Sequence, residues 1–432
     1  MRHRFGASYS RLFAANALSA VGTGMTVSAL PLLASIRPPS EFMLGIIAAA
    51  GLLPGVLLAV PAGLMADRFD RGRVLVVADV ARAVVMALGA LAVLVGNLPG
   101  AALALIAFLI GAGDTIFVTA AQSAVPSFVS PEHLDDANGH LQAADNVGSE
   151  FVGPPVGSVL FRVGTWLPLA ADAVTYLVSA VLLSRLPRTA PAPATKTRTD
   201  DVSGAATAHD SDAGEAAAAR PTMAPAWAHF RQSRPLVVLG ASMLMLSLCG
   251  SAVLAMLVLL VTERLQLNEV WFGTALTMVA CGATVAGVIA GRIRARVPAR
   301  LAIAGGVAAN AIGYIVLGTT RLWPVAAVAL VVWGFAVTLG NITSVGIRQR
   351  IIAPALIGRV MGIFRAALGM GGVIGALGGG ALGRATSAGT VAVVAGVVQL
   401  PVVAALLIGL PRGVGDVPPA RAEPGQPDAA TT

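Results

Sequence analysis

The sequence predicts an all-α membrane protein with about twelve transmembrane helices, arranged as two six-helix bundles. Three observations lead to this fold class. Of the 432 residues, 56% are hydrophobic and only 12% are charged, whereas a soluble chain carries about 25% charged residues. Apolar runs of roughly 20 residues, enough to cross the hydrocarbon core of a bilayer, recur along the chain. A polar segment near the middle separates these runs into two equal groups.

The apolar runs give the expected positions of the spans. We expect them at 12–34, 43–65, 74–96, 101–123, 138–161, 166–186, 236–261, 270–291, 300–319, 322–345, 358–382 and 387–410. The fourth, fifth and eleventh runs contain charges or many glycines, which transmembrane helices tolerate. Arginines gather at the N-terminus and in the loops after the second, eighth and tenth runs. By the positive-inside rule, both termini are expected to be cytoplasmic.

Composition divides the chain into four expected parts. Residues 1–186 form an N-terminal bundle and residues 235–410 a C-terminal bundle. Between them, residues 187–234 are expected to be a flexible cytoplasmic linker, because Ala, Pro, Thr and Asp predominate without an apolar periodicity. Within the linker, 226–234 is expected to form a short interfacial helix. Residues 411–432 are expected to be a disordered cytoplasmic tail.

The two bundles show a weak internal repeat at an offset of about 223 residues, as in transporters built from parallel repeats. The matching pairs are Gly111 with Gly334, Pro131 with Pro354 and Gly139 with Gly362. The repeat predicts that a parallel pseudo-two-fold axis relates the halves.

The segment GLMADRFDRGR follows the second span. Its spacing resembles the G-x-x-x-D-R-x-x-R-x-R signature of the major facilitator superfamily, through Gly63, Asp67, Arg68, Arg71 and Arg73. The resemblance implies a cytoplasmic gate in which the Asp67 carboxylate meets a helix N-terminus or an arginine of the facing bundle. We expect Gly63 to allow close helix approach. The plain alternative is a solvated turn that obeys the positive-inside rule.

A second motif lies in the fifth span, at Gly148, Gly153, Pro154 and Gly157. It is similar to the antiporter motif of the superfamily, with Ser158 in place of a second closing glycine. The resemblance implies export in exchange for protons. Pro154 is expected to interrupt the helix, and the glycines to permit tight helix contact. Ordinary helix packing is the alternative.

Three more segments, at 78–83, 122–139 and 348–362, resemble the exporter branch that contains siderophore, macrolide and multidrug efflux proteins. Relatives often carry an arginine immediately before the glutamine that ends the fourth helix. This chain has Ala121 before Gln122. A charge relay through such an arginine is therefore not expected in the N-terminal half.

Ionisable residues inside a membrane are costly and point to function. The candidates are Asp79, Arg82, Asp114, Asp145, Glu150, Asp172 and Arg365. Asp79 and Arg82 share a helix face and are expected to form a buried charge pair. A structural role is expected for this pair and for Asp172. Arg82 lies at the level of the carboxylates of the fourth and fifth helices, and we expect the excess carboxylates there to carry protons.

Glu150 is the first choice for the proton-coupling group, with Asp114 second and Asp145 also a candidate. Glu150 lies near the midplane and shares a helix face with Pro154 and Gly157. In a regular helix Asp145 would lie about 140° from Glu150, so the two are not expected to face the same place. A hydrogen-bonded packing role is the alternative for Glu150.

In the eleventh span, Arg365 is expected to bind an anionic substrate or to pair with a carboxylate. The same span carries glycines at a spacing of four residues, which predicts one smooth face for close helix contact and for rocking. These glycines are Gly371, Gly375, Gly379 and Gly383.

The resulting hypothesis is a secondary active transporter for proton-driven efflux of a small organic compound, such as a drug, a macrolide or a siderophore-like molecule. The alternative is an importer or uniporter of a small metabolite on the same fold. We expect no enzyme activity, no cofactor, no metal site and no nucleic-acid partner, since no catalytic or metal-ligand spacing occurs in the sequence. The expected partners are a small-molecule substrate, protons and the lipid bilayer of the cell membrane, with the protein a monomer.

Overall fold

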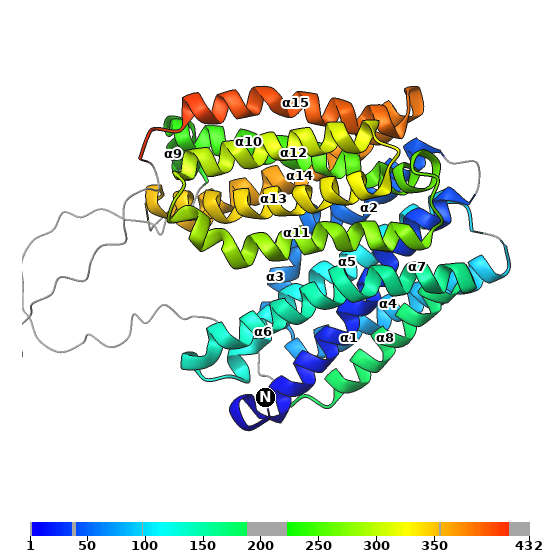
Figure 1. Ribbon diagram of the computed structural model, residues 1–432. Coiled ribbons are helices and arrows are strands. Elements are labelled where there is room, and N and C mark those ends of the chain that lie inside the picture. The colour runs from blue at the N-terminus through cyan, green and yellow to red at the C-terminus, as the bar shows by residue number, and fades with distance from the viewer. Residues whose placement is uncertain (1, 37–39, 97, 188–222, 354–355, 414–432) are drawn as a thin grey trace, which may run out of the picture.

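The computed structural model describes residues 2–36, 40–96, 98–187, 223–353 and 356–413. In these residues it is built from helices, without strands (Figure 1). Of the expected linker at 187–234, residues 188–222 lie outside the described residues, as do residues 414–432 of the expected tail.

Ten helices of the described chain are long and apolar enough to cross a membrane. They coincide with ten of the twelve spans expected from the sequence. They are α1 (Arg2–Ser35), α4 (Arg71–Leu94), α5 (Gly100–Ala124), α8 (Leu167–Ser184), α10 (Arg234–Leu259), α11 (Val270–Arg294), α12 (Ala299–Thr319), α13 (Trp323–Ile351), α14 (Ile357–Ala385) and α15 (Ala388–Gly409).

The span expected at 43–65 is divided into two helices. They are α2 (Glu41–Leu57) and α3 (Ala59–Arg68), and the division falls at Leu58. Pro61 has no N–H to donate to the carbonyl of Leu57, so the regular ladder cannot continue through this point.

The span expected at 138–161 is interrupted as well. It consists of α6 (Leu134–Asn146), the π-helix η3 (Val147–Val152) and α7 (Gly153–Val163). Pro154 and Pro155 cannot donate the bonds that a regular helix would make to the carbonyls of residues 150 and 151. The π-helix, whose turn is wider than that of an α-helix, lets the chain continue past these two residues that lack an N–H donor.

Each half packs its helices in the same pattern. In the N-terminal half, the pairs in contact include α1 with α7 and α8, α2 with α5, and α4 with α5 and α8. The C-terminal half repeats this pattern in α10 with α14 and α15, α11 with α13, and α12 with α13 and α15. The equivalent pairing is what a parallel repeat of six-helix units predicts.

The repeat is also visible in single residues. Gly111 of α5 packs on the backbone of α2, where an added Cβ would lie 3.3 Å from the carbonyl carbon of Gly51. Its predicted counterpart Gly334 of α13 packs on α11, where an added Cβ would lie 3.0 Å from the nitrogen of Ala283. Both glycines therefore permit the same close helix contact in their own half.

The two halves touch mainly at one end of the bundles. Gly45 of α2 packs against Gly380 of α14, and Gly273 of α11 packs against Pro154 and Ser158 of α7. Toward the opposite end, α6 and α11 diverge (Figure 1). We call that opposite end the arginine-rich side, because it holds Arg68, Arg71, Arg73, Arg292, Arg294 and Arg296.

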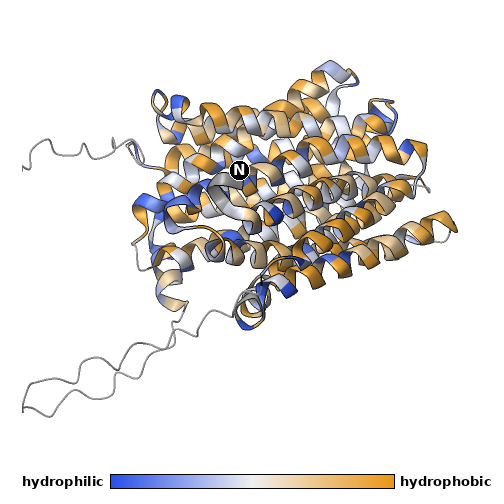
Figure 2. Ribbon diagram, turned by 90° about the horizontal axis from the view of Figure 1, so that it is seen from below, coloured by the Kyte–Doolittle hydropathy of each residue, from blue (hydrophilic) through white to orange (hydrophobic). Residues whose placement is uncertain are grey.

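The outer surface fits a lipid environment. Exposed large apolar side chains run along α4 and α8, among them Val77, Leu88, Leu91, Leu177 and Val181. Hydrophobic residues cover the middles of the helices, and hydrophilic residues lie mainly near their ends (Figure 2). A short helix, α9 (Ala224–Gln232), lies where the sequence predicts one at 226–234, and its Phe230 meets Phe364 of α14 edge to face at 5.7 Å.

Candidate functional site

A cavity of about 490 Å³ lies between the two halves. The N-terminal half contributes α1, α5, α6, η3 and α7, and the C-terminal half contributes α10, α11 and α13. The polar and charged side chains that line it are Asn16, Ser19, Thr23, Asp114, Asp145, Ser149, Glu150 and Thr338. All three charged residues are carboxylates, and all three come from the N-terminal half.

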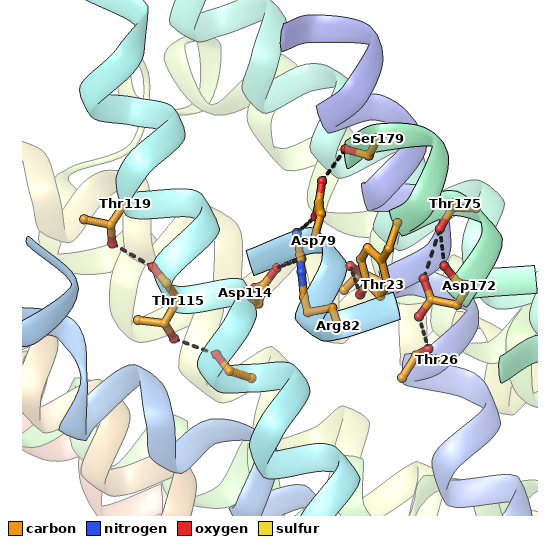
Figure 3. A network of polar contacts seen from close by, with 12 residues as sticks. Thr23, Thr26, Asp79, Arg82, Asp114, Thr115, Thr119, Asp172, Thr175 and Ser179 are labelled. Carbon is orange, nitrogen blue, oxygen red and sulfur yellow. Dashed lines mark hydrogen bonds and ion pairs between the residues drawn. The ribbon is translucent and has the colours of Figure 1, made fainter. Parts of the chain in front are cut away.

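Behind the cavity, Arg82 of α4 joins two carboxylates. Its Nη2 forms an ion pair with Oδ1 of Asp79, and its Nη1 donates to Oδ1 of Asp114 at 3.2 Å (Figure 3). Ser179 of α8 donates to the other oxygen of Asp79 at 2.5 Å. The network therefore connects α4, α5 and α8 through charge-assisted hydrogen bonds.

Aromatic rings enclose the Arg82 guanidinium. Its Cζ lies 4.5 Å from the ring centroid of Phe117 and 4.3 Å from that of Tyr176. Cation–π contacts of this kind gain strength when the cation is removed from water. They hold the guanidinium in a fixed position.

Burial differs sharply between the members of this network. The side chains of Arg82 and Asp79 are 1% and 0% exposed, whereas that of Asp114 is 44% exposed. Asp114 is thus the point where a buried charge network reaches the central cavity. The expected charge pair of Asp79 and Arg82 exists, but it also contacts a residue of the cavity.

The prediction that Asp145 and Glu150 face different directions is wrong. Both line the cavity. The prediction assumed a regular α-helix, but the π-helix η3 begins two residues after Asp145 and contains Glu150. Its larger number of residues per turn shifts the angle between them and brings both carboxylates to the same space.

Asp172 of α8 is fully buried and makes no ion pair among the described residues. Its carboxylate accepts hydrogen bonds from the hydroxyls of Thr26 and Thr175, the second at 3.1 Å (Figure 3). Thr26 belongs to α1, so Asp172 ties α8 to α1. This placement fits the structural role expected from the sequence.

The glycines of the antiporter-like motif make the close contacts expected of them. A Cβ added to Gly148 would lie 2.9 Å from the nitrogen of Val21, and one added to Gly157 would lie 2.7 Å from the Cα of Met25. Gly153 packs similarly closely against Gly24 of α1. The glycines of the motif thus let α7 and η3 pack closely against α1 within the N-terminal half. Pro154 lines the cavity.

The gate motif spans the end of α3 and the start of α4. Gly63 has open space around it, with nothing within 4 Å of an added Cβ, so the expected close helix contact is absent from this conformation of the described chain. Arg71 donates to Ser127 at 3.1 Å, while Arg68 and Arg73 are exposed. The side chain of Asp67 lies outside the described part of the structure.

The structure does not bring Arg365 to the site. It is exposed on α14, does not line the cavity between the halves and makes no ion pair among the described side chains. Among the described residues of the C-terminal half, Arg348 is a buried arginine; it lies in α13, although the sequence predicts that the tenth span ends at residue 345 and that an arginine-containing loop follows. It is 2% exposed and stacks on Phe364 at 4.3 Å.

Sequence reasoning also missed Thr23, Asn16 and Trp333, which line the cavity. Neutral residues inside apolar runs carry no signal of their own. Only the fold places them beside the carboxylates.

A second cavity of about 290 Å³ adjoins the first. Thr23, Val27, Asp114, Leu254 and Leu276 line both. Most of its other lining is apolar, including Leu30, Leu44, Ile47, Ala255 and Phe272. It lies toward the end at which the two halves touch.

Comparison with known proteins identifies the family. A model of the Major Facilitator Superfamily matches residues 12–375 and 244–430. The chain belongs to the Major Facilitator Superfamily. It is a multi-pass membrane transporter and not an enzyme.

Among curated relatives of this superfamily transporter, the multidrug efflux pump Tap of Mycolicibacterium fortuitum is 30% identical over 181 residues. That match covers 40% of this chain and 44% of the pump, so the chain spans less than half the length of this relative.

Solved structures of the superfamily share the fold. The nucleoside transporter NupG superposes with a TM-score of 0.71 at 12% identity, over 93% of this chain and 98% of NupG. A bacterial homologue of the iron transporter ferroportin, in an inward-facing state, gives 0.68 at 15% identity, over 92% and 98% of the two chains. A bacterial homologue of the lysosomal transporter Spinster, inward-facing and unoccupied, gives 0.65 at 12% identity, over 93% and 94%.

Proposed function

We propose that this protein exports a small organic compound in exchange for protons, by alternating access of the central cavity. One observation carries the proposal. Three carboxylates from one half line a cavity between two halves, and one of them, Asp114, is paired with a buried arginine. Such an arrangement lets a proton and a substrate influence the same charge network.

Arg82 supplies a physical route for coupling. When Asp114 is ionised, it shares the guanidinium with Asp79 and holds α5 to α4. A proton on Asp114 removes its charge and leaves Arg82 to Asp79 alone. The contact between α4 and α5 then weakens, and the relative stability of the two conformations changes. Glu150 and Asp145 are further proton carriers in this proposal.

The orientation of the cycle follows from the arginines. The arginine-rich side faces the cytoplasm of the cell membrane by the positive-inside rule, with both termini on that side. The present conformation is then inward-facing, and the protein acts as a monomer. The gate motif would close this side when Asp67, near the end of α3, meets a helix N-terminus or an arginine of the C-terminal half.

A transport assay tests the function. Proteoliposomes with an imposed pH gradient are screened with organic compounds, and everted membrane vesicles report the direction. We expect energised everted vesicles to accumulate substrate, because an exporter pumps into their lumen. Accumulation in right-side-out vesicles instead would establish the alternative, an importer.

The coupling residues are tested by Asp114→Asn and Glu150→Gln. We expect Asp114→Asn to reduce gradient-driven accumulation at least tenfold, since no proton can titrate the amide. Glu132→Gln, an exposed carboxylate outside the cavity, is the matched control and should transport normally. Full gradient-driven transport by Asp114→Asn and Glu150→Gln alike would remove both residues from the coupling mechanism.

A further inference from the structure

We propose that the substrate is an amphipathic organic cation, whose charged group binds between Asp145 and Glu150 and whose apolar part occupies the second cavity beyond Asp114. The inference rests on the proposed function in one respect, that the central cavity is the substrate site.

The charge of the cavity favours a cation. Among the described residues that line either cavity there is no arginine, lysine or histidine. Asp114 already shares Arg82 with Asp79. Asp145 and Glu150 form no ion pair with any described residue. An anion entering here would meet unpaired carboxylates, whereas a cation would be attracted by them.

The described residues that the C-terminal half contributes to the cavity carry no charge. It faces the two carboxylates with Leu254, Leu276, Val279, Trp333 and neighbouring small side chains. Trp333 is an aromatic residue among those that line the cavity, and it is 8% exposed. An aromatic face suits an organic cation better than an anion, because the ring face is negative.

The second cavity explains why the cation should be amphipathic. It continues from the first past Asp114, Val27 and Leu276 and is lined mainly by aliphatic side chains and Phe272. The volumes of about 490 and 290 Å³ lie in or near the range of small-molecule sites. A ligand with charge at one end and apolar bulk at the other matches both environments at once.

The π-helix is the element that creates this recognition site. It places Asp145 and Glu150 on one cavity although a regular helix would separate them. Two carboxylates that flank one position can bind a single positive group from two sides. The pair thereby becomes a determinant of specificity that sequence periodicity alone does not reveal.

Binding of two ions of equal shape and opposite charge tests the proposal. The purified full-length protein is titrated with tetraphenylphosphonium and with tetraphenylborate, without a pH gradient. We expect the cation to bind and the borate to bind at least tenfold more weakly. Equal or tighter binding of tetraphenylborate would refute the proposal.

Variants locate the charged group. We expect Asp145→Asn with Glu150→Gln to weaken binding of tetraphenylphosphonium at least tenfold. The swap Asp145→Glu with Glu150→Asp keeps both charges and should retain most of the affinity. Asp135→Asn, exposed on the same helix and outside both cavities, is the matched control. Unchanged affinity in a well-folded double variant, judged by its thermal unfolding, would contradict the assignment.

A third variant tests the apolar part. Ala48→Phe narrows the second cavity and should weaken binding of tetraphenylphosphonium more than that of the much smaller tetramethylammonium. Failure of this inference differs from failure of the proposed function. Cation binding without proton-driven flux would leave the substrate class intact, whereas proton-driven flux of a compound with no positive charge would refute the substrate class alone.

Discussion

Arg82 would serve both stability and function in the proposed mechanism. It is 1% exposed, touches Asp79 and Asp114, and lies between the rings of Phe117 and Tyr176. A buried ion pair adds little net stability, but removing one partner leaves an uncompensated charge. The arginine is therefore hard to replace whatever its part in transport.

A double-mutant cycle measures this dependence. We expect Arg82→Gln to destabilise the protein by about 3–5 kcal/mol, because Asp79 would remain buried without its cation. Adding Asp79→Asn should restore a large part of the loss, since the orphaned charge is then gone. Thermal unfolding in one detergent compares the wild type, the two single variants and the double variant. Strict additivity of the two single losses would show that the pair is not coupled.

At the scale of the element, the glycines of α14 have a more local task than expected. Gly371, Gly375 and Gly379 pack against α10 at Leu244, Leu248 and Ala252, which share the same spacing of four residues. Both helices belong to the C-terminal half, so at these three glycines the expected close face is confirmed within that half, whereas the fourth, Gly383, also meets Glu41 of α2. The neighbouring Gly380 instead meets Gly45 of α2, across the contact of the halves.

Two alanine substitutions in α14 separate packing from helix propensity. At Gly375 an added Cβ would lie 2.7 Å from the Cα of Leu248, whereas at Gly378 nothing lies within 4 Å. We expect Gly375→Ala to destabilise the protein by about 1–3 kcal/mol through overpacking. Gly378→Ala should leave stability unchanged or raise it by up to about 1 kcal/mol. Equal melting temperatures of both variants would disprove this view of the α10–α14 contact.

For the whole molecule, the two halves repeat one packing pattern but differ in chemistry. In the N-terminal half, α4 and α8 are linked by Asp79 and Ser179, beside the charged Arg82. The corresponding helices of the C-terminal half, α12 and α15, are linked by a neutral bond of 3.0 Å from Asn310 to Gln399. The titratable groups of the cavity are thus concentrated in one half, while the other supplies a neutral wall.

The asymmetric opening of the molecule can be tested by labelling. In a background of Cys249→Ser and Cys281→Ser, Thr338→Cys lies in the central cavity, whereas Leu44→Cys lies near the contact of the halves and is 2% exposed as leucine. A membrane-impermeant maleimide applied from the arginine-rich side should label the first at least tenfold faster. Similar rates for both positions would contradict an inward-facing conformation.

The sequence alone supports the fold class, the repeat and the family motif for clear physical reasons. Apolar runs must be long enough to match the bilayer thickness, and arginines concentrate in the loops on one side of the membrane. Glycines such as Gly111 and Gly334 mark equivalent helix contacts in the two halves. Ten of the expected spans are continuous helices in the structure. Both interrupted spans contain prolines, and a proline disrupts the helix locally because it lacks a backbone N–H donor. These properties depend on composition and short-range geometry, which a single sequence carries in full.

Only the tertiary structure decided which charges meet. Asp79, Arg82 and Asp114 lie on two helices, and their contact depends on how α4 packs beside α5. Asp145 and Glu150 line one cavity where a π-helix that contains Glu150 interrupts the α-helix, and Arg365 stays away from the site although it lies in an expected span. Periodicity determines the face of a regular helix that a residue occupies. The helix that lies opposite that face, and the regularity of the helix itself, are set by packing between distant segments.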